Sequence, residues 1–554
     1  MVFFIIPGQI NCIRLFDNKL FNKYKIYIIY MKFINELTYE NYIKKNQENV
    51  FHKKFDHAVE SIKKQFNNND YPIIINNEKI YTKDKYKHVS PVDRRIILGH
   101  ISKISDPLIS KAIESSYHSF KDWSKLNYKK RIKILKKVAN TIRVKKFQLA
   151  ALLTFENGKN RYESIADIDE AIDFINYYCS DMINNNGYVT KTKSIKKNPK
   201  NISVLKPYGV WAIISPFNFP AAIFVGMNIG AIITGNTVVA KPASNTPLIG
   251  YKIVEIMIES GLPPGVLNYI TGDAAKIGKI IINDDKISGL VFTGSKDVGY
   301  TLYKNSADIK PRLIIAELGG KNPTIVTKTA DLDKAAEGVS RAAFSYAGQK
   351  CSACSRVYVQ KNVKEEFIAK LITKVKKINV ENPNKINCDV GPLINFNALQ
   401  NFKKYVDIAS QDGRILYGGK VKEEGNLKYG YYVSPTIVSE ISLDNILFKK
   451  ELFLPFLCIG EFDQFYEALD LCNNSEYGLT AGLYSKDKKE INDFLNNIES
   501  GVVYVNRPKS STTGALVGNQ SFGGWKNSGF SGKGTGGKYY LTQFMREQSQ
   551  TIVD

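Results

Sequence analysis

The sequence predicts an α/β protein built on parallel sheets that carry helices on both faces. Between residues 209 and 320, short apolar runs rich in β-branched residues alternate with helical segments. Runs such as GVWAIISP, TVVAKP and GLVFTGS are apolar throughout, which is typical of strands buried on both faces. An alternation of strand and helix places such strands parallel to one another.

Up to about residue 180 the pattern is mainly helical, with one short hairpin at YPIIINNEKIYT (71–82). Helices are expected at Phe55 to Phe66, Pro107 to Leu126, Tyr128 to Ile142, and Tyr162 to Met182. In the third helix Leu135, Val138 and Ile142 recur at helical spacing, so its lysines occupy the solvated face. Residues 183–207 are polar and predict either a linker or a protruding hairpin.

Within the alternating region, helices are expected from Pro220 to Gly235 and from Pro247 to Ser260. Asn245 or Thr246 is a candidate cap for the second helix, and Gly261 follows its end. A second α/β unit begins at about residue 321, with a helix from Val363 to Ile378. Ligands of parallel sheets bind outside the carboxyl ends of the strands, so polar residues after strands are candidate site residues.

The composition limits the function classes. The formal charge of +24 raises the question of nucleic acid or anionic membrane as a partner. The lysines are spread along the chain without a long basic run, so we expect neither partner. Seven scattered cysteines, an odd number, indicate a reducing compartment. Residues 1–30 form an N-terminal extension before Met31, which favours a cytoplasmic protein. A transit peptide for the mitochondrial matrix is the alternative.

Five polar clusters stand out. PFNFP (216–220), AKPAS (240–244), FTGSKDVG (292–299) and ELGGK (317–321) follow strands, and GQKCSACSR (348–356) follows a helix. In this order and spacing they resemble the aldehyde dehydrogenase superfamily, from about Phe33 to the C-terminus. GQKCSACSRVYV (348–359) and TTGALVGNQSFGGWKNSG (512–529) are most similar to the Δ1-pyrroline-5-carboxylate dehydrogenases, as are YPIIINNEKIYT (71–82) and AIDFINYYCSDM (171–182).

The resemblance implies oxidation of L-glutamate γ-semialdehyde to L-glutamate in proline catabolism, with NAD as cofactor. Another short ω-semialdehyde acid, such as succinate semialdehyde, is the alternative substrate. The implied fold has a Rossmann-like dinucleotide-binding domain (31–182 and 208–320) and an α/β catalytic domain (321–529). A small β element (183–207 and 530–554), with the strand-like tail YYLTQFMREQ, bridges subunits, so we expect a homodimer or higher homo-oligomer.

For catalysis the resemblance assigns the nucleophile to Cys351, the general base to Glu317 and the oxyanion donor to Asn218. Most cysteines are buried and inert, and Cys351 also forms a CxxC with Cys354. A single CxxC makes a poor zinc site, and the last of the five histidines is His118, so we expect no metal. A Cys/His hydrolase is equally disfavoured, because no imidazole lies in the motif region.

For the cofactor, Ser295 is a candidate N-cap of a helix whose N-terminus favours pyrophosphate, and Gly294 and Gly299 allow the backbone to approach. By resemblance Lys241 contacts the adenosine ribose, while Glu451 and Phe453 hold the nicotinamide ribose.

Three positions near the cofactor depart from the family pattern. Ser244 replaces a common acidic residue, which leaves NADP open as a cofactor. Leu454 replaces a common Gly, and Phe217 replaces a common Trp.

For the substrate, the resemblance implies a carboxylate anchor made by the Gly514 and Ala515 N–H groups and the Ser352 hydroxyl. Phe219 and Phe522 would flank the aliphatic portion. The alternative interpretation is an ordinary loop at 512–515 and core packing for both phenylalanines.

Overall fold

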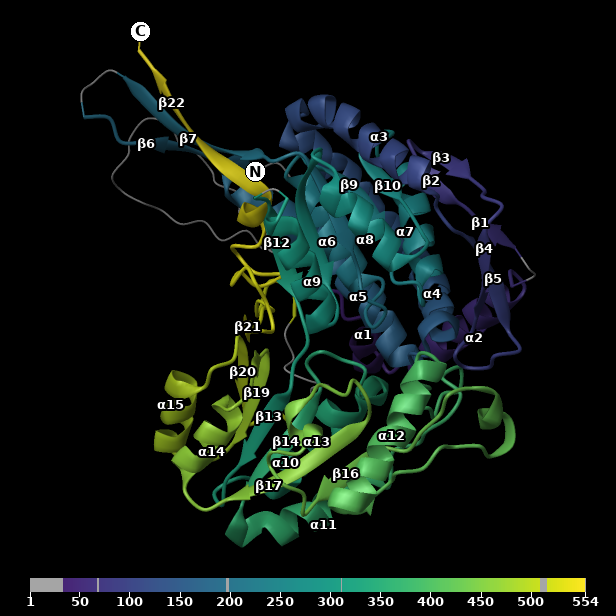
Figure 1. Cartoon of the computed structure of the whole chain (residues 1–554), viewed down its shortest axis with the longest axis vertical. Coiled ribbons are helices and arrows are strands. Elements are labelled where there is room, and N and C mark those ends of the chain that lie inside the picture. The colour runs from purple at the N-terminus through teal and green to yellow at the C-terminus, as the bar shows by residue number, and fades with distance from the viewer. Residues whose placement is uncertain (1–32, 67–68, 196–198, 310, 509–515, 554) are drawn as a thin grey trace.

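The computed structural model describes residues 33–66, 69–195, 199–309, 311–508 and 516–553. Two α/β units lie one above the other in Figure 1, and a β arm extends from the upper one. The upper, first unit contains the described chain before β13 (Asn322–Val326), apart from the arm. The lower, second unit begins with β13. The extension predicted for residues 1–30 lies outside the described residues.

The first unit contains a seven-stranded sheet of order β12-β11-β8-β9-β10-β2-β3. Strands β8 to β12 pair in parallel, whereas β2 and β3 add an antiparallel hairpin at one edge. The strands are β2 (Ile73–Ile75), β3 (Glu78–Ile80), β8 (Val210–Ile214), β9 (Thr237–Lys241), β10 (Leu267–Tyr269), β11 (Ile287–Thr293) and β12 (Leu313–Glu317). The chain runs outward from β8 to β10 and then returns to β11 beside β8. The point where the strand order reverses therefore lies between β8 and β11, where such folds bind ligands.

Helices cover both faces of this sheet, as the sequence predicts. Along β8, Trp211 and Ile213 join the core formed with α4 to α7, whereas Val210 and Ala212 join the core formed with α3 and α8. The helices are α1 (Thr38–Lys44), α2 (Glu48–Lys63), α3 (Asp106–Lys125), α4 (Tyr128–Asn157), α5 (Arg161–Asn184), α6 (Ala222–Ile233), α7 (Pro247–Glu259), α8 (Ala274–Asn283) and α9 (Lys296–Ala307). A small sheet of order β1-β5-β4 lies beside them, formed by β1 (Asp70–Tyr71), β4 (Lys85–Val89) and β5 (Ile97–Ser102).

The second unit repeats this design with a sheet of order β15-β16-β17-β14-β13-β19-β20, in which only the β15–β16 pair is antiparallel. Its strands are β13 (Asn322–Val326), β14 (Cys354–Gln360), β15 (Arg414–Tyr417), β16 (Thr436–Ser439), β17 (Phe456–Phe462), β19 (Thr480–Tyr484) and β20 (Val502–Val505). A separate pair joins β18 (Tyr477–Gly478) to β21 (Trp525–Lys526). Its helices are α10 (Leu332–Phe344), α11 (Lys364–Val375), α12 (Phe396–Asp412), α13 (Ile446–Lys449), α14 (Phe465–Asn473) and α15 (Lys488–Asn497). Short 3-10 turns are η1 (Asn186–Tyr188), η2 (Ser345–Gly348), η3 (Lys361–Val363), η4 (Gly425–Tyr429) and η5 (Leu541–Phe544).

The β arm consists of β6 (Val189–Thr192), β7 (Lys200–Pro207) and β22 (Met545–Ile552), all antiparallel. The hairpin alternative for residues 183–207 is therefore confirmed. The strand prediction for YYLTQFMREQ is correct only from Met545 onward. Before it, Leu541–Phe544 form the 3-10 turn η5, because Tyr540, Leu541 and Phe544 are buried against the first unit's core. The Phe544 ring lies 4.8 Å from that of Trp211.

Two further details of the sequence prediction are corrected. Helix α4 continues fifteen residues beyond Ile142 to Asn157. Residues 149–157 are all buried, so the one-sided pattern that marks a surface helix is lost there. Thr246 is the N-cap of α7 but makes no side-chain cap hydrogen bond. Instead the Glu156 carboxylate, from α4, accepts from the Leu248 and Ile249 N–H groups at 2.5 and 2.9 Å.

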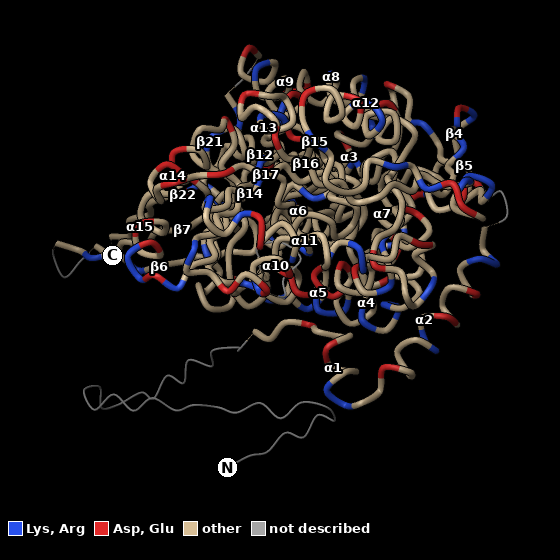
Figure 2. Tube along the Cα trace, turned by 90° about the horizontal axis from the view of Figure 1, so that it is seen from below, with Lys and Arg blue, Asp and Glu red and all other residues tan. Residues whose placement is uncertain are grey.

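Charge is distributed over the whole molecule. Figure 2 shows Lys and Arg along all parts of the chain, with Asp and Glu interspersed among them. Among the described residues, no helix combines the length and apolar composition that a bilayer crossing requires.

The buried cap of α7 gives a stability prediction. Glu156→Ala leaves two buried N–H groups without their acceptor, so we expect the free energy of unfolding to fall by about 3 kcal/mol, measured by urea denaturation. Glu114→Ala is the matched control, because its ion pair with Lys286 is half-exposed. It should leave the unfolding midpoint unchanged. Equal midpoints for both variants would contradict the capping role.

Candidate active site

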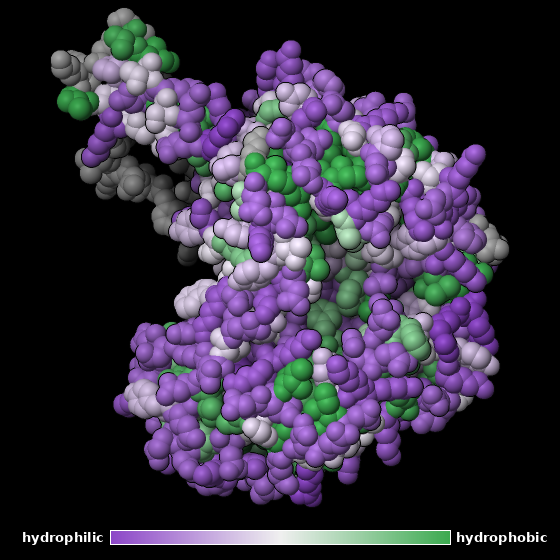
Figure 3. Space-filling view, viewed as in Figure 1, coloured by the Kyte–Doolittle hydropathy of each residue, from purple (hydrophilic) through white to green (hydrophobic). Residues whose placement is uncertain are grey.

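The carboxyl ends of the parallel strands gather most of the predicted residues at one edge of the first sheet. Asn218 follows β8, Lys241 ends β9, Gly294 follows β11 and Glu317 ends β12. The Gly294 N–H donates to the Glu317 carbonyl at 3.2 Å. The second unit faces this edge, and Figure 3 shows the surface hollowed between the two units, with apolar residues in its depth. The site is therefore built between the two sheets.

Cys351 is the only partly exposed cysteine among the described residues; the other five there are buried. It follows a turn in which Tyr346, Ala347 and Gly348 all have positive φ, a costly conformation for the first two. The Tyr346 hydroxyl stabilises the turn by donating to the Asn157 carbonyl at 3.0 Å. Burial, followed by the charges of Glu451 and Glu317, raises the pKa of the Cys351 thiol to about 12. The thiol is therefore protonated at neutral pH until a ligand or a base changes its surroundings.

The backbone around Cys351 is held by its neighbours. The Asn322 side-chain amide donates to the carbonyls of Cys351 and Ala353 at 2.7 and 2.9 Å. A Cβ atom at Gly320 would lie 2.6 Å from the Cys351 carbonyl oxygen, so the ELGGK motif approaches this turn only because a glycine stands there. The thiol thus sits on a fixed backbone.

Glu317 is suited to accept a proton. Its side chain is 8% exposed, and Oε2 has no hydrogen-bond partner. Burial raises the pKa of the carboxyl well above its usual range, while a backbone hydrogen bond from Gly524 opposes this shift. A carboxylate with a raised pKa is a stronger base than one in water.

Asn218 is also buried without a complete set of partners. It is 3% exposed, and its Oδ1 atom makes no hydrogen bond. Buried amides are normally satisfied, so an amide left incomplete at a strand end is a candidate ligand group. The oxyanion pair of the Asn218 amide and the Cys351 N–H stays a prediction.

The N-terminus of α9 has the features expected of a phosphate site. Ser295 is the N-cap of α9, as predicted, and its side chain makes no cap hydrogen bond. A Cβ atom at Gly299 would lie 2.5 Å from Leu318, so this glycine lets α9 pack closely against the loop after β12. The uncapped N–H groups and the helix dipole can attract an anion.

Lys241 and Ser244 differ sharply in environment. Lys241 is 3% exposed, and burial lowers its pKa to about 8, opposed by the Asp273 charge. Its Nζ donates to the Pro242 carbonyl at 3.1 Å. Ser244 is exposed, and its carbonyl accepts from the Tyr86 hydroxyl.

Glu451 and Phe453 lie where the two units meet. The Gly320 N–H donates to Glu451 Oε1 at 2.9 Å, and burial raises the pKa of this carboxyl to about 7. Phe453 has φ +58° and packs edge-on against Phe217, with centroids 5.7 Å apart. Leu454 is buried, and its carbonyl lies against Gly348, so it links this stretch to the Cys351 turn.

Three of the predicted substrate residues are described. Phe219 is half-buried under the Lys159 ammonium, which lies 3.7 Å from its ring centroid. Ser352 is buried next to Cys351. Phe522 is half-buried and bridges Thr535 through two backbone hydrogen bonds. Gly514 and Ala515 lie outside the described residues.

Comparison with known proteins identifies the family. The model of the aldehyde dehydrogenase family matches residues 80–550. The chain belongs to this family.

Relatives of this aldehyde dehydrogenase cover nearly its whole length. It is 37% identical over 509 residues to 1-pyrroline-5-carboxylate dehydrogenase 1 of Halalkalibacterium halodurans, covering 91% of this chain and 96% of that one. It is 35% identical to the 1-pyrroline-5-carboxylate dehydrogenase of Geobacillus kaustophilus, covering 88% and 93%. A Thermus 1-pyrroline-5-carboxylate dehydrogenase structure with bound NAD matches with a TM-score of 0.88 and 32% identity, over 95% of this chain and 99% of that one.

The sequence analysis missed two buried lysines of this aldehyde dehydrogenase. Lys159 pairs with Asp167 at 2.8 Å, and both side chains are inaccessible. Lys350, next to Cys351, pairs with Glu163 at 3.0 Å and lies 5.9 Å from the Phe219 ring. The one signal that could have indicated Lys159 is that it is a lysine within the stretch 149–161, which is buried throughout.

The raised pKa of Cys351 predicts how the free enzyme reacts with iodoacetamide. Only the thiolate is alkylated, and its fraction grows about tenfold per pH unit below the pKa. The inactivation rate constant should therefore rise throughout pH 7 to 10 without reaching a plateau. Cys351→Ala should show no labelling of this loop by mass spectrometry. A rate that bends at about pH 8.5 and levels off above it would indicate an ordinary thiol pKa and contradict the effect of burial.

Proposed function

We propose that this aldehyde dehydrogenase oxidises L-glutamate γ-semialdehyde, the open form of Δ1-pyrroline-5-carboxylate, to L-glutamate with NAD in proline catabolism. The observation that carries the proposal is the match to relatives named 1-pyrroline-5-carboxylate dehydrogenase over about nine-tenths of the chain. The cysteine, glutamate and asparagine of the predicted catalytic set all lie at the facing edges of the two units.

The first half of the reaction forms a bond to sulfur. The Cys351 thiol gives its proton to solvent, and the thiolate forms a bond to the aldehyde carbon; the C=O electron pair moves to the oxygen, which gains negative charge. The Asn218 amide and the Cys351 N–H are the proposed donors to that oxygen. Bound NAD would supply the hydride acceptor, so that loss of hydride from the adduct carbon leaves a thioester. Glu451 and Phe453 would hold the nicotinamide ribose, and Phe217 packs against Phe453.

The second half releases the acid. Glu317 takes a proton from water, and the resulting hydroxide adds to the thioester carbon. The carbon–sulfur bond then breaks, and Cys351 leaves as the thiolate. Burial suits Glu317 to this role, because it makes the carboxylate a better base than it would be in water.

The residues present fit a dinucleotide. The N-terminus of α9 carries no side-chain cap, which leaves its N–H groups for a pyrophosphate near Gly294 and Ser295. Lys241 ends β9, on the other side of β8 from β11, and is the proposed contact to the adenosine ribose. With Ser244 in place of a carboxylate, a 2′-phosphate meets no negative charge at this position, so NADP is the proposed second cofactor.

We further propose that the first unit is the dinucleotide-binding domain and the second the catalytic domain. The β arm supports a homodimer or higher homo-oligomer, because β6 and β22 form the two outer strands of its sheet. The relatives come from bacteria, which favours a cytoplasmic location.

The reaction is tested by following NADH formation with Δ1-pyrroline-5-carboxylate. Cys351→Ala should abolish turnover, and Asn218→Ala should lower kcat about 100- to 1000-fold. Cys354→Ala is the matched control: this nearby cysteine is buried and lies outside the proposed chemistry, so activity should remain. Turnover of succinate semialdehyde but not of Δ1-pyrroline-5-carboxylate would support the proposed chemistry and contradict the proposed substrate.

Cofactor choice is tested at Ser244. Ser244→Glu places a carboxylate where the 2′-phosphate of NADP would lie, so we expect KM for NADP to rise at least about tenfold. KM for NAD should change less than about twofold, because a carboxylate can accept a hydrogen bond from the 2′-hydroxyl. Ser244→Ala serves as the control for loss of the hydroxyl. Equal effects of Ser244→Glu on both cofactors would contradict this placement.

A further inference from the structure

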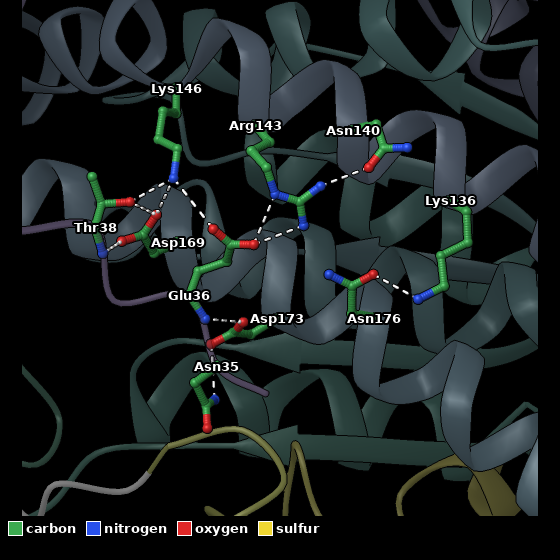
Figure 4. Close-up of polar contacts among 10 residues, drawn as sticks. All are labelled: Asn35, Glu36, Thr38, Lys136, Asn140, Arg143, Lys146, Asp169, Asp173 and Asn176. Atoms are coloured by element: carbon green, nitrogen blue, oxygen red, sulfur yellow. Dashed lines mark hydrogen bonds and ion pairs between the residues drawn. The ribbon is translucent and has the colours of Figure 1, made fainter. Parts of the chain in front are cut away.

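A short segment near the start of the described chain, Phe33–Thr38, is fastened to helix α5 by two buried carboxylates (Figure 4). Asp173 accepts from the Asn35 side-chain amide and the Glu36 N–H, both at 2.8 Å. Asp169 accepts from the N–H and hydroxyl of Thr38, both at 2.7 Å. We call residues 33–38 the strap.

Helix α4 secures the same strap with positive charge. Arg143 and Lys146 pair with Glu36 at 2.7 and 3.3 Å, and Lys146 also pairs with Asp169 at 3.1 Å. These contacts add to those from α5, and hydrogen bonds to charged groups are stronger than neutral ones. The strap therefore has one fixed position on α4 and α5.

From this position Asn35 reaches the loop Leu516–Phe522. The Asn35 amide that binds Asp173 also donates to the Val517 carbonyl at 3.0 Å, and its oxygen accepts from the Asn519 side chain at 2.5 Å. Between these residues Gly518 has φ +77°, and a Cβ there would meet Tyr177 at 2.8 Å and Phe33 at 2.9 Å. The strap and α5 thus hold both sides of this turn.

The same loop leads directly to the proposed substrate and base. Phe522 is the last residue of this loop. A Cβ atom at the next residue, Gly523, would lie 3.7 Å from Glu317 Oε1. Glu317 is fixed independently by β12, which pairs in register with β11. Phe522 lies outside that sheet: its backbone pairs with Thr535, and the loop before it donates from the Gln520 side chain to the Val503 carbonyl. A loosened loop would therefore move Phe522 more than Glu317.

We infer that the strap positions the substrate side of the active site, with Asn35 as the positioning residue that links Asp173 to the Val517–Asn519 turn. This inference rests on the proposed function, because Phe522 acquires its role from the amino-acid semialdehyde. Loss of the link should weaken binding of that substrate and leave the chemical step nearly intact.

The first test is Asn35→Ala in the full chain. KM for Δ1-pyrroline-5-carboxylate should rise at least about tenfold, while kcat changes less than about twofold. Kinetics with propanal, a simple aldehyde, should stay within about twofold of the wild type. Hydrogen exchange of the 516–524 peptide should become faster. Asn176→Ala is the matched control, because Asn176 also joins α5 to α4, through Lys136 at 2.8 Å, but touches no strap residue.

A second variant separates attachment of the strap from its contact with the loop. Asn35→Asp with Asp173→Asn keeps a donor–acceptor pair between the two side chains and the same net charge, but removes the N–H that binds the Val517 carbonyl. We expect it to restore the thermal stability lost in Asn35→Ala but not the KM.

The outcomes are distinct. Unchanged KM and exchange in Asn35→Ala, or a fall in propanal and Δ1-pyrroline-5-carboxylate turnover by the same factor, would overturn the inference. Restoration of KM by the double variant would also overturn it. A wild-type enzyme inactive on Δ1-pyrroline-5-carboxylate but active on propanal would instead refute the proposed function, and the exchange measurement would still decide whether Asn35 orders the loop.

Discussion

Close packing at Gly319 and Gly320 is the constraint on which the active site depends. A Cβ atom would lie 2.1 Å from the Glu451 carboxylate at Gly319 and 2.6 Å from the Cys351 carbonyl at Gly320. These two glycines connect the last strand of the first sheet to the first strand of the second. Because no side chain separates them from their neighbours, the proposed base, nucleophile and ribose-binding carboxylate all meet at one crossing of the chain.

Burial where these residues meet shifts the pKa values of the ionisable groups in the site. It raises the pKa of the Cys351 thiol and of the Glu317 and Glu451 carboxyls, and lowers that of Lys321 to about 8. Every one of these shifts favours the neutral form. Lys321 Nζ has no hydrogen-bond partner, which is costly for a buried ammonium. Burial therefore reduces the charge that these groups carry before a ligand binds.

Much of this arrangement follows from sequence patterns. Uniformly apolar runs predicted the buried parallel strands, and the polar residues after them predicted Lys241, Gly294 and Glu317 at one sheet edge. Patterns of single elements could not show which strands are neighbours, so the hairpin predicted at 71–82 could not be placed at the edge of this sheet. Thr246 is the N-cap of α7, as predicted, but the side chain that accepts from the first N–H groups is Glu156, which is ninety-one residues earlier than Pro247 in the chain. The strap could not be predicted from the sequence either, because the partners of Asn35 are distant in the chain and reach it only after folding.

The length of helix α4 limits which insertions and deletions the protein tolerates. Its thirty residues lead to Glu156, which caps α7, and to Asn157, whose carbonyl holds the Tyr346 turn before Cys351. Deleting one residue from a helix rotates everything beyond it by about 100° and shifts it by about 1.5 Å. Insertions and deletions within α4 would therefore misplace both contacts at once. Among related chains its length should be preserved more strictly than the identity of its exposed residues.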